Sequence, residues 1–277
     1  MRQQEGRKRR MNLKELCGKI GMDKEVQKQV SGIKPDIPEE LLKELTEEEK
    51  AEKAYHKLLP LCKKEIRGLD MLAYMLYAAL NTREKYRKMG IEETVFLKTM
   101  SCFSRFVNEY QSSYGVYGFD RGWWTWRQLS MTLFRVGELE YEFKKGEKKI
   151  FLHVPSDADI RISLCRTSVE DFHKFTGIFF SEMENWPVVM ESWLLSPSLK
   201  YLLDKNSKII QFGDCFQVEA WDKDDTEFLQ WVYGRKDVAY QNLPESTTLQ
   251  KNMKRYLQEG KKVGTATGYL LAFQEER

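Results

Sequence analysis

The hydrophobic period of the sequence changes once, near residue 131, and this change most strongly limits what the chain can fold into. Up to about Ser113, apolar residues recur at the three- and four-residue spacing of amphipathic helices. Met131–Phe143 (MTLFRVGELEYEF) instead carries strand-like aromatic and β-branched residues, and a Lys/Gly turn follows it. We therefore expect a helical N-terminal part and a second part that contains a β-sheet and carries any chemistry.

The expected domain boundaries follow from this change and from charge. Residues 1–11 are expected to form a disordered basic tail, residues 12–117 a helical N-terminal domain and residues 118–277 the sheet-containing domain. The first ten residues hold a net charge of +4, which leaves −1 for the rest of the +3 chain. A nearly neutral body is not the basic surface of a nucleic-acid-binding protein. The remaining alternative is that the basic tail binds nucleic acid. It predicts an affinity that falls steeply with salt concentration, and a salt dependence that disappears when residues 1–10 are deleted.

Hydropathy and cysteine content limit the class further. No apolar run approaches the roughly 18 residues of a membrane-spanning helix, so no membrane partner is expected. The five cysteines are widely spaced and contain no CxxC pair, which argues against a disulfide framework or a zinc site. The three histidines lack metal-ligand spacing. The sequence thus favours a cytoplasmic protein with reduced thiols and no metal.

Periodicity and capping signals predict the elements of the first part. The expected helices cover residues 12–20 with Asn12 as the cap, 22–30, 38–53, 55–66, 69–87 ended by Gly90, and 92–110. Three tryptophans follow, Trp123, Trp124 and Trp126. They fit either a stacking platform or a contact between the two domains, and we favour the contact.

In the second part, strand and helix signals alternate. Strands are expected at Leu133–Phe143 and Lys149–Val154, paired as a hairpin, and at Val188–Leu195, Lys208–Trp221 and Val263–Phe273. Helices are expected after a cap at Thr167 or Ser168, at Ser198–Leu203, and at Leu249–Glu259 after a cap at Thr247 or Thr248. The glycines of Gly264–Gly268 indicate a bulge or a close backbone approach.

From Leu133 onwards this order resembles the GNAT acyltransferase fold, a mixed sheet splayed between two central strands where acyl-CoA inserts. The segments LFRVGELEYEF, HVPSDADI, SWLLSPSLKYLL and LPESTTLQKNMKRYL are similar to the landmarks of one family. Its members have a helical GNAT-like N-terminal domain and a GNAT-like C-terminal domain. The resemblance covers the chain from about Asn12 and implies an α+β fold with acyl-CoA, such as acetyl-CoA, as co-substrate.

The resemblance also implies a place for the CoA pyrophosphate, which needs several N–H groups converging at a helix N-terminus. The corresponding turn after the candidate fourth strand is Leu195–Leu199, so Leu195, Ser196 and Ser198 are the candidate cofactor-binding residues. The glycines of the usual Q/R-x-x-G-x-G/A loop are missing there, and Pro197 removes one N–H.

Catalysis would require a base, because an amine must lose a proton before it attacks a thioester. Glu191 is one candidate, provided that it faces the site, where desolvation would raise its pKa. His153, at the end of the Lys149–Val154 strand, is the other. Tyr201 and Tyr233 are candidate acids for the leaving thiolate. Both candidate bases have a structural alternative. Glu191 could be an outward-facing charge, and His153 could make a loop contact.

Two functions remain open on this basis. The first is a GNAT-like acyltransferase that moves an acyl group from acyl-CoA to an amine of a small molecule or peptide. The second is a catalytically inactive GNAT fold that serves as a ligand-binding or protein-interaction module, which the missing glycines favour. The sequence carries no signal for the acceptor or the oligomeric state.

Overall fold

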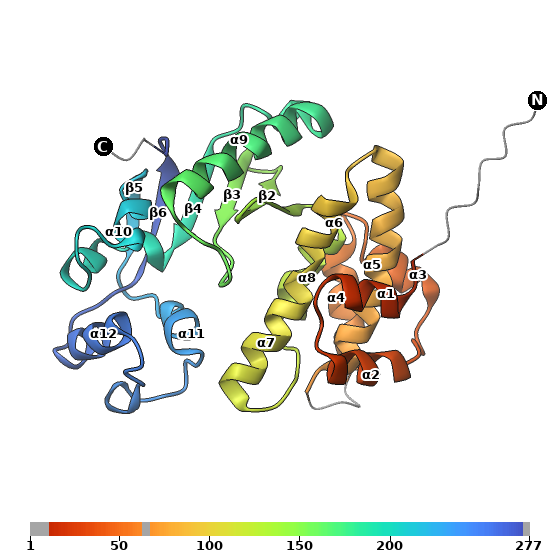
Figure 1. Cartoon of the computed structure of the whole chain (residues 1–277), viewed down its shortest axis with the longest axis horizontal. Coiled ribbons are helices and arrows are strands. Elements are labelled where there is room, and N and C mark those ends of the chain that lie inside the picture. Colours follow the sequence, from red (N-terminus) through yellow and green to blue (C-terminus); the bar gives the residue numbers. More distant parts are fainter. Residues whose placement is uncertain (1–10, 63–66, 274–277) are drawn as a thin grey trace, which may run out of the picture. The chain divides into compact units, whose positions relative to one another are not determined.

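A computed structural model describes residues 11–62 and 67–273, and the chain divides into two compact units, Met1–Met131 and Thr132–Arg277 (Figure 1). Most of the expected basic tail, residues 1–10, lies outside the described residues. The division falls later than the expected boundary after residue 117. The reason is that Gly122–Leu129, which carries the three tryptophans, folds as helix α8 and packs against α4 and α5 of the first unit.

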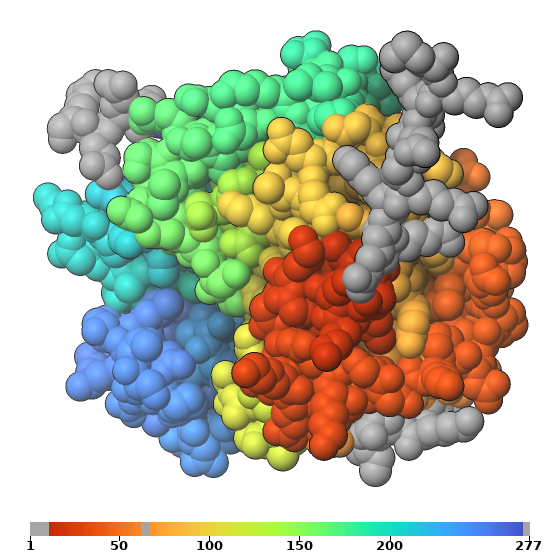
Figure 2. All heavy atoms as spheres, turned by 45° about the vertical axis from the view of Figure 1, so that its right-hand side comes forward, coloured from red at the N-terminus to blue at the C-terminus, as the bar shows by residue number. Residues whose placement is uncertain are grey.

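The N-terminal unit is helical and is built around one long helix, α5, Leu69–Met89. Helices α1, α2, α3, α6 and α8 all contact α5, which explains why it is apolar on several sides. The N-terminal helices, red to orange, form one continuous surface in Figure 2. The other elements of this unit are α1 Leu13–Lys19, α2 Lys24–Gly32, α3 Glu39–Glu44, α4 Ala51–Leu58, the 3₁₀ turn η1 Leu59–Leu61, α6 Glu93–Met100 and α7 Cys102–Tyr114.

Local capping signals were predicted well in this unit. Asn12 caps α1 and forms a capping box with Glu15, and α5 ends at Gly90 in the left-handed conformation. Two expected helices are broken, however. The 38–53 helix ends after α3, where the Thr46 hydroxyl donates to Lys43 O, and the 92–110 helix breaks at Ser101, whose hydroxyl donates to Lys98 O. Such hydroxyls compete with the helical backbone for its hydrogen bonds.

The C-terminal unit is a mixed six-stranded sheet in the order β1-β2-β3-β4-β6-β5. All neighbouring strands are antiparallel except β3 and β4, which are parallel and are joined by the crossover helix α9, Ile162–Phe179. The predicted α+β class is confirmed. The strands are β1 Leu133–Val136, β2 Leu139–Lys144, β3 Lys149–His153, β4 Val188–Ser192, β5 Phe216–Asp222 and β6 Thr265–Leu270.

Helix α9 lies along the sheet (Figure 1) and makes its aromatic core. The ring of Phe172 stacks on that of Tyr141 at 3.8 Å and an interplanar angle of 5°. The hydroxyl of Ser168 donates to Val136 O and hydrogen-bonds the Tyr141 hydroxyl at 3.0 Å. The expectation that Thr167 or Ser168 caps this helix was therefore wrong, because the helix begins earlier and Ser168 ties its interior to the β1–β2 turn.

Three strand predictions need correction as well. The first expected strand is divided at Gly137, which has a positive φ of 65°, into β1 and β2. The Val188–Leu195 strand ends at Ser192, whose side chain accepts from Leu194 N and starts the 3₁₀ turn η3, Trp193–Leu195. The Lys208–Trp221 strand is wrong in its first half, where Ser207 caps helix α10, Lys208–Gly213. In each case a local cap or turn overrides β-forming side chains.

A helical segment separates β5 from β6. It contains α11 Phe228–Tyr233, η5 Tyr240–Asn242 and α12 Thr248–Gln258. Thr247, one of the two residues predicted to cap this last helix, does so and forms a capping box with Gln250. Its core is shared with the preceding 3₁₀ turn η4, Pro197–Tyr201, and with α10. The buried residues of this core are Leu199, Leu202, Ile210, Phe228, Leu229, Tyr233, Leu243, Met253, Leu257 and Val263.

The glycines at the start of β6 make the close backbone approach that was expected. Gly264 has a positive φ, and a Cβ there would lie 2.3 Å from Asp222 O; at Gly268 a Cβ would lie 2.9 Å from Gln217 O. The register of β5 against β6 shifts between Val218 and Ala220, which places a bulge opposite Thr267 and Gly268.

Substituting Gly264 with alanine is expected to lower the free energy of unfolding by about 2–4 kcal/mol, because it combines a strained φ with a backbone clash. Gly260→Ala is the matched control, since Gly260 has a similar φ of 75° but no atom within 4 Å of the added Cβ. The control is expected to lose only about 1 kcal/mol. Urea unfolding of both variants makes the comparison, and equal losses would contradict the close-approach explanation.

Within residues 11–62 and 67–273, no helix combines the length and the hydrophobicity that crossing a bilayer requires. In the same residues, no three His, Cys, Asp or Glu side chains come together in a way that would hold a metal ion. The five cysteines are free thiols, and burial raises the pKa of Cys17 to about 11 and of Cys165 to about 12. These two thiols are therefore poor nucleophiles near neutral pH.

Candidate active site

The two parallel strands at the centre of the sheet pair over only part of their length. Ile150 pairs with Val188 and Phe151 pairs with Val189, and the register ends there. Strand β3 nevertheless continues to His153 and β4 continues to Ser192. The strands therefore diverge at their C-terminal ends, which in open sheets with parallel strands is the usual side for ligand binding.

The two predicted bases lie at matching positions on the diverging ends. His153 is two residues beyond Phe151, and Glu191 is two residues beyond Val189, the residues of the last register pair. Because side chains alternate along a strand, both project from the same face of the sheet. Glu191 is exposed and His153 is partly buried. An imidazole and a carboxylate thus flank the point where the strands separate.

His153 has a carboxylate partner on β2. Its Nε2 lies 3.0 Å from Oε2 of Glu142, whose side chain is only 5% exposed, and Lys144 Nζ lies 2.5 Å from the other oxygen, Oε1. A carboxylate at Nε2 favours the tautomer that carries its proton there, which leaves the lone pair on Nδ1. The Glu142 contact therefore orients the ring of His153, with Nε2 towards β2.

The loop from β3 to α9 carries two aspartates, each held by a cation. Asp157 accepts two hydrogen bonds from Nη1 of the buried Arg135, at 2.9 Å. Asp159 accepts from the backbone N–H of Arg161, pairs with the Arg161 guanidinium at 2.8 Å, and lies 3.4 Å from Lys208 Nζ. These contacts, led by the backbone N–H of Arg161, lower the pKa of Asp159.

This arrangement bears on whether the site fits the pyrophosphate of CoA. Arg161 is the N-cap of α9 and makes no side-chain capping hydrogen bond. The first turn of this 18-residue helix therefore offers N–H groups. The carboxylate of Asp159 lies beside that turn, and it pairs there with Arg161 and Lys208. The residues fit an anionic group here, although the loop lacks the glycines of the usual motif.

The structure places the predicted cofactor-binding residues after β4. Ser196 and Ser198 are buried, and their hydroxyls donate to Val263 O at 2.5 Å and to Lys262 O at 2.8 Å. Both hydroxyls thus hold the η4 turn against the chain that enters β6. Leu195 is buried and Tyr201, at the end of η4, is 81% exposed. The roles of these four residues in binding or catalysis stay predictions.

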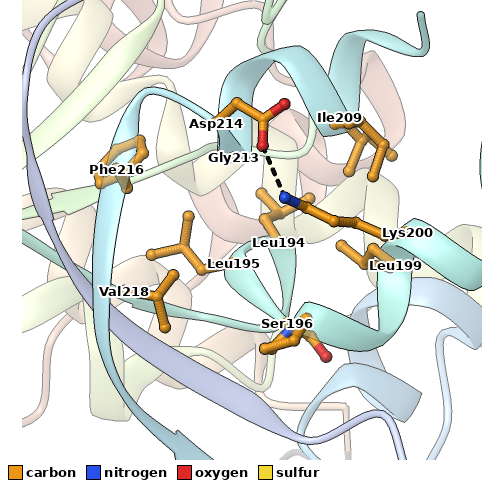
Figure 3. Close-up of a pocket in the computed structure, with 12 residues that line it drawn as sticks. Leu194, Leu195, Ser196, Leu199, Lys200, Ile209, Gly213, Asp214, Phe216 and Val218 are labelled. Carbon is orange, nitrogen blue, oxygen red and sulfur yellow. Dashed lines mark ion pairs between the residues drawn. The ribbon is translucent and has the colours of Figure 1, made fainter. Parts of the chain in front are cut away.

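Leu195 and Ser196 also line a pocket of about 300 Å³ in the C-terminal unit (Figure 3). Its wall is formed by the segment after β4, by α10 and by β5. Leu195, Phe216 and Val218 lie around the same space, and Lys200 pairs with Asp214 at 3.1 Å beside it. The lining residues are Leu194, Leu195, Ser196, Pro197, Leu199, Lys200, Ile209, Ile210, Gly213, Asp214, Phe216 and Val218.

Sequence reasoning missed the residues that support the two candidate bases and the loop. Glu142 and Lys144 were detectable, because they alternate with the apolar residues Tyr141 and Phe143 in the strand pattern and so share one face. No local signal pointed to Lys208, since its approach to Asp159 depends on how α10 packs near α9, whereas Arg161 lies only two residues from Asp159.

Comparison with known families identifies this architecture. A family model for a GNAT-like C-terminal domain matches residues 96–270, and one for an N-acyltransferase N-terminal domain matches residues 11–131. The chain belongs to the GNAT-like acyltransferase family. Membership explains the splayed β3–β4 pair, which is the sheet feature that the sequence resemblance predicted. Among curated proteins, none matches the chain in sequence.

Solved structures with the same GNAT-like fold are distant in sequence. A mutant acyltransferase in complex with octanoyl-CoA superposes with a TM-score of 0.74 at 20% identity, over 93% of this chain and 87% of the other. An acyltransferase in complex with decanoyl-CoA and teicoplanin has a TM-score of 0.67 at 19% identity, over 94% and 99%. An acyltransferase in complex with CoA and 10C-teicoplanin has a TM-score of 0.67 at 18% identity, over 94% of this chain and 99% of the other. At these identities the likeness shows the fold.

Proposed function

We propose that this protein transfers an acyl group from acyl-CoA to an amine of a small-molecule or peptide acceptor. The observation that carries the proposal is the divergence of β3 and β4, with His153 and Glu191 at matching positions on one face. A splayed parallel pair admits the pantetheine arm, and the two side chains stand where a nucleophile would need to lose a proton.

Support also comes from the relatives. The structural neighbours are acyltransferases that hold octanoyl-CoA, decanoyl-CoA or CoA, and two of them also hold teicoplanin or its 10C form. Their fold covers nearly all of this chain. An acyl-CoA donor and an acceptor of the small-molecule or peptide class are therefore the natural extension to this protein.

Each part of the site has a separate role in the proposed reaction. Acyl-CoA supplies a thioester carbonyl that is activated towards attack by an amine. The first turn of α9, with Arg161 and Lys208, would hold the pyrophosphate by N–H groups and by charge. His153, oriented by Glu142, accepts the amine proton at Nδ1, and Glu191 attracts a cationic amine to the same face. Tyr201 stays the candidate acid for the leaving thiolate.

Titration calorimetry tests the proposal directly. CoA, acetyl-CoA and octanoyl-CoA are each expected to bind the purified protein, and Arg161→Ala combined with Lys208→Ala is expected to weaken all three alike. Lys174→Ala, which removes an exposed lysine of α9 paired with Asp171, is the matched control and is expected to change nothing. A screen of amines with release of free CoA as the signal then identifies the acceptor.

The opposite result has a definite meaning. If none of the three compounds produces heat at millimolar concentration, the acyltransferase proposal fails. The chain would then be the inactive GNAT-fold binding module, and the glycine-free β3–α9 loop with its two aspartates is the feature that favours this alternative.

A further inference from the structure

One carboxylate of the chain already engages the donors that the proposed function assigns to the pyrophosphate. Asp159 Oδ1 accepts from the backbone N–H of Arg161 at 3.1 Å and from Lys208 Nζ at 3.4 Å, and its Oδ2 accepts from Arg161 Nε at 2.8 Å. Among the residues that the structure describes, no other carboxylate pairs with either cation. A carboxylate and a phosphate compete for such donors, because both are anions that accept charge-assisted hydrogen bonds at a helix N-terminus.

The same contacts keep the Asp159 carboxylate charged. The hydrogen bond from the backbone N–H of Arg161 is the main cause of its lowered pKa, and the side chains of Arg161 and Lys208 act in the same direction. Asp159 is therefore ionised at neutral pH. A pyrophosphate that approached Arg161 and Lys208 would meet this negative charge within hydrogen-bonding range of the same donors, and the repulsion opposes its binding.

The Asp159 side chain is free to leave this position while the loop backbone stays in place. Two contacts that do not involve this side chain hold the loop between β3 and α9. Asp157 accepts from Arg135, and the backbone N–H of Asp159 donates to Glu138 Oε2 at 3.0 Å. The Asp159 side chain is 36% exposed, so a change of its own rotamer turns the carboxylate towards solvent. Its release therefore costs only the contacts with Arg161 and Lys208.

We propose that the Asp159 carboxylate takes the place of the pyrophosphate in the free protein and leaves the N-terminus of α9 when acyl-CoA binds. The inference rests on the proposed function and concerns how its donor site is filled. Every ligand with a pyrophosphate has to displace Asp159. A nucleotide such as ADP lacks the pantetheine arm and has fewer contacts with which to offset that cost. Asp159 therefore lowers the occupancy of the site by such nucleotides, whereas the additional contacts of acyl-CoA compensate.

Calorimetry with CoA and with ADP tests this inference on the wild type, Asp159→Ala and Asp159→Asn. Both variants are expected to bind each compound about tenfold more tightly, because the competing charge is gone. Asp157→Asn is the matched control, since it makes the same charge change in the same loop, on the carboxylate that Arg135 holds. The control is expected to change both affinities by less than about twofold. Circular dichroism melts show whether each variant is folded.

A further set of variants identifies the groups for which Asp159 competes. In an Arg161→Ala/Lys208→Ala background, Asp159→Ala is expected to lose most of its tenfold gain, because the side-chain donors that ligand and carboxylate share are absent. Repulsion that acted only at long range would give the same gain in both backgrounds.

Three results overturn the inference and leave the proposed function standing. The first is equal CoA affinity of the wild type and both Asp159 variants. The second is weaker binding by folded Asp159→Ala, which would show that the carboxylate positions Arg161 and Lys208 for the phosphate. The third is a gain that survives in full in the Arg161→Ala/Lys208→Ala background. Absence of CoA binding by the wild type and all variants overturns the proposed function, and the inference with it.

Discussion

Replacing His153 with alanine is expected to lower kcat by about 10²–10⁴-fold near pH 7 and to leave the affinity for acyl-CoA unchanged. The imidazole lies at the end of β3, where the strands diverge, and its Nε2 is held 3.0 Å from Glu142. A positioned general base contributes to the rate by this order of magnitude. The measurement is release of free CoA with the acceptor found in the amine screen, at saturating acyl-CoA.

Companion variants separate a chemical role of His153 from a structural one. His153→Gln keeps a donor for the Glu142 carboxylate but cannot accept a proton as imidazole does, so it is expected to be as inactive as the alanine variant. Glu142→Gln is expected to retain part of the activity, because the amide oxygen can still accept from Nε2 of His153 although the charge is lost. His173→Ala, on the exposed side of α9, is the matched control.

Glu191 provides the competing assignment. If the His153 variants retain wild-type kcat while Glu191→Gln loses it, the base is Glu191 and the contact between His153 and Glu142 is structural. If all of them retain activity, neither predicted base acts, and the proposed chemistry at the β3–β4 divergence is contradicted.

The second large effect is on stability. Phe172→Ala is expected to lower the free energy of unfolding by about 3–5 kcal/mol, because the ring is fully buried and stacks on Tyr141 at 3.8 Å. Its removal would leave a cavity between α9 and the sheet that neighbouring rings fill only in part. Chemical unfolding in urea, followed by tryptophan fluorescence and circular dichroism, gives the value.

Ile178→Ala is the control on the same helix, since Ile178 is 73% exposed. Its effect is expected to stay within about 0.5 kcal/mol, as for other surface substitutions. A loss for Phe172→Ala that is no larger than the control loss would mean that α9 is not anchored to the sheet through this ring, and that the aromatic core is held elsewhere.

The parts of the fold that could be predicted are those with local causes. Asn12 and Thr247 precede helices with a partner three residues later, and Gly90 ends α5 in the left-handed conformation, so each signal lies within a few residues of its effect. The α+β class followed from the change of period near residue 131. Sequence neighbours alone were sufficient for these features.

The parts that failed depend on local caps and turns together with distant contacts. The segment KIIQFG, residues 208–213, has β-forming side chains, yet it is helical because Ser207 caps it and because Ile210 and Phe212 are buried. Ser168 was taken for a cap, but its hydroxyl bonds to Val136 and Tyr141, which lie about 30 residues away in the chain.

The candidate site shows the same division. His153 and Glu191 were each identified from residue type and strand context, but their matching positions depend on the register of β3 with β4 across the whole of α9. Ser196 and Ser198 were chosen as hydroxyl donors for a phosphate. The structure shows their hydroxyls donating to carbonyls more than 60 residues further on, a contact that no local pattern indicates, and their role at a phosphate stays a prediction.

The helical segment between β5 and β6 leaves and re-enters the sheet at one point, because Asp222 and Thr265 are partners in the strand register. An insertion whose two ends coincide can change in length without moving the strands that carry it. The length and sequence of this helical segment can therefore differ between related chains. The shared core limits such changes, because Leu199, Leu202 and Ile210 lie outside the segment and pack against its buried residues.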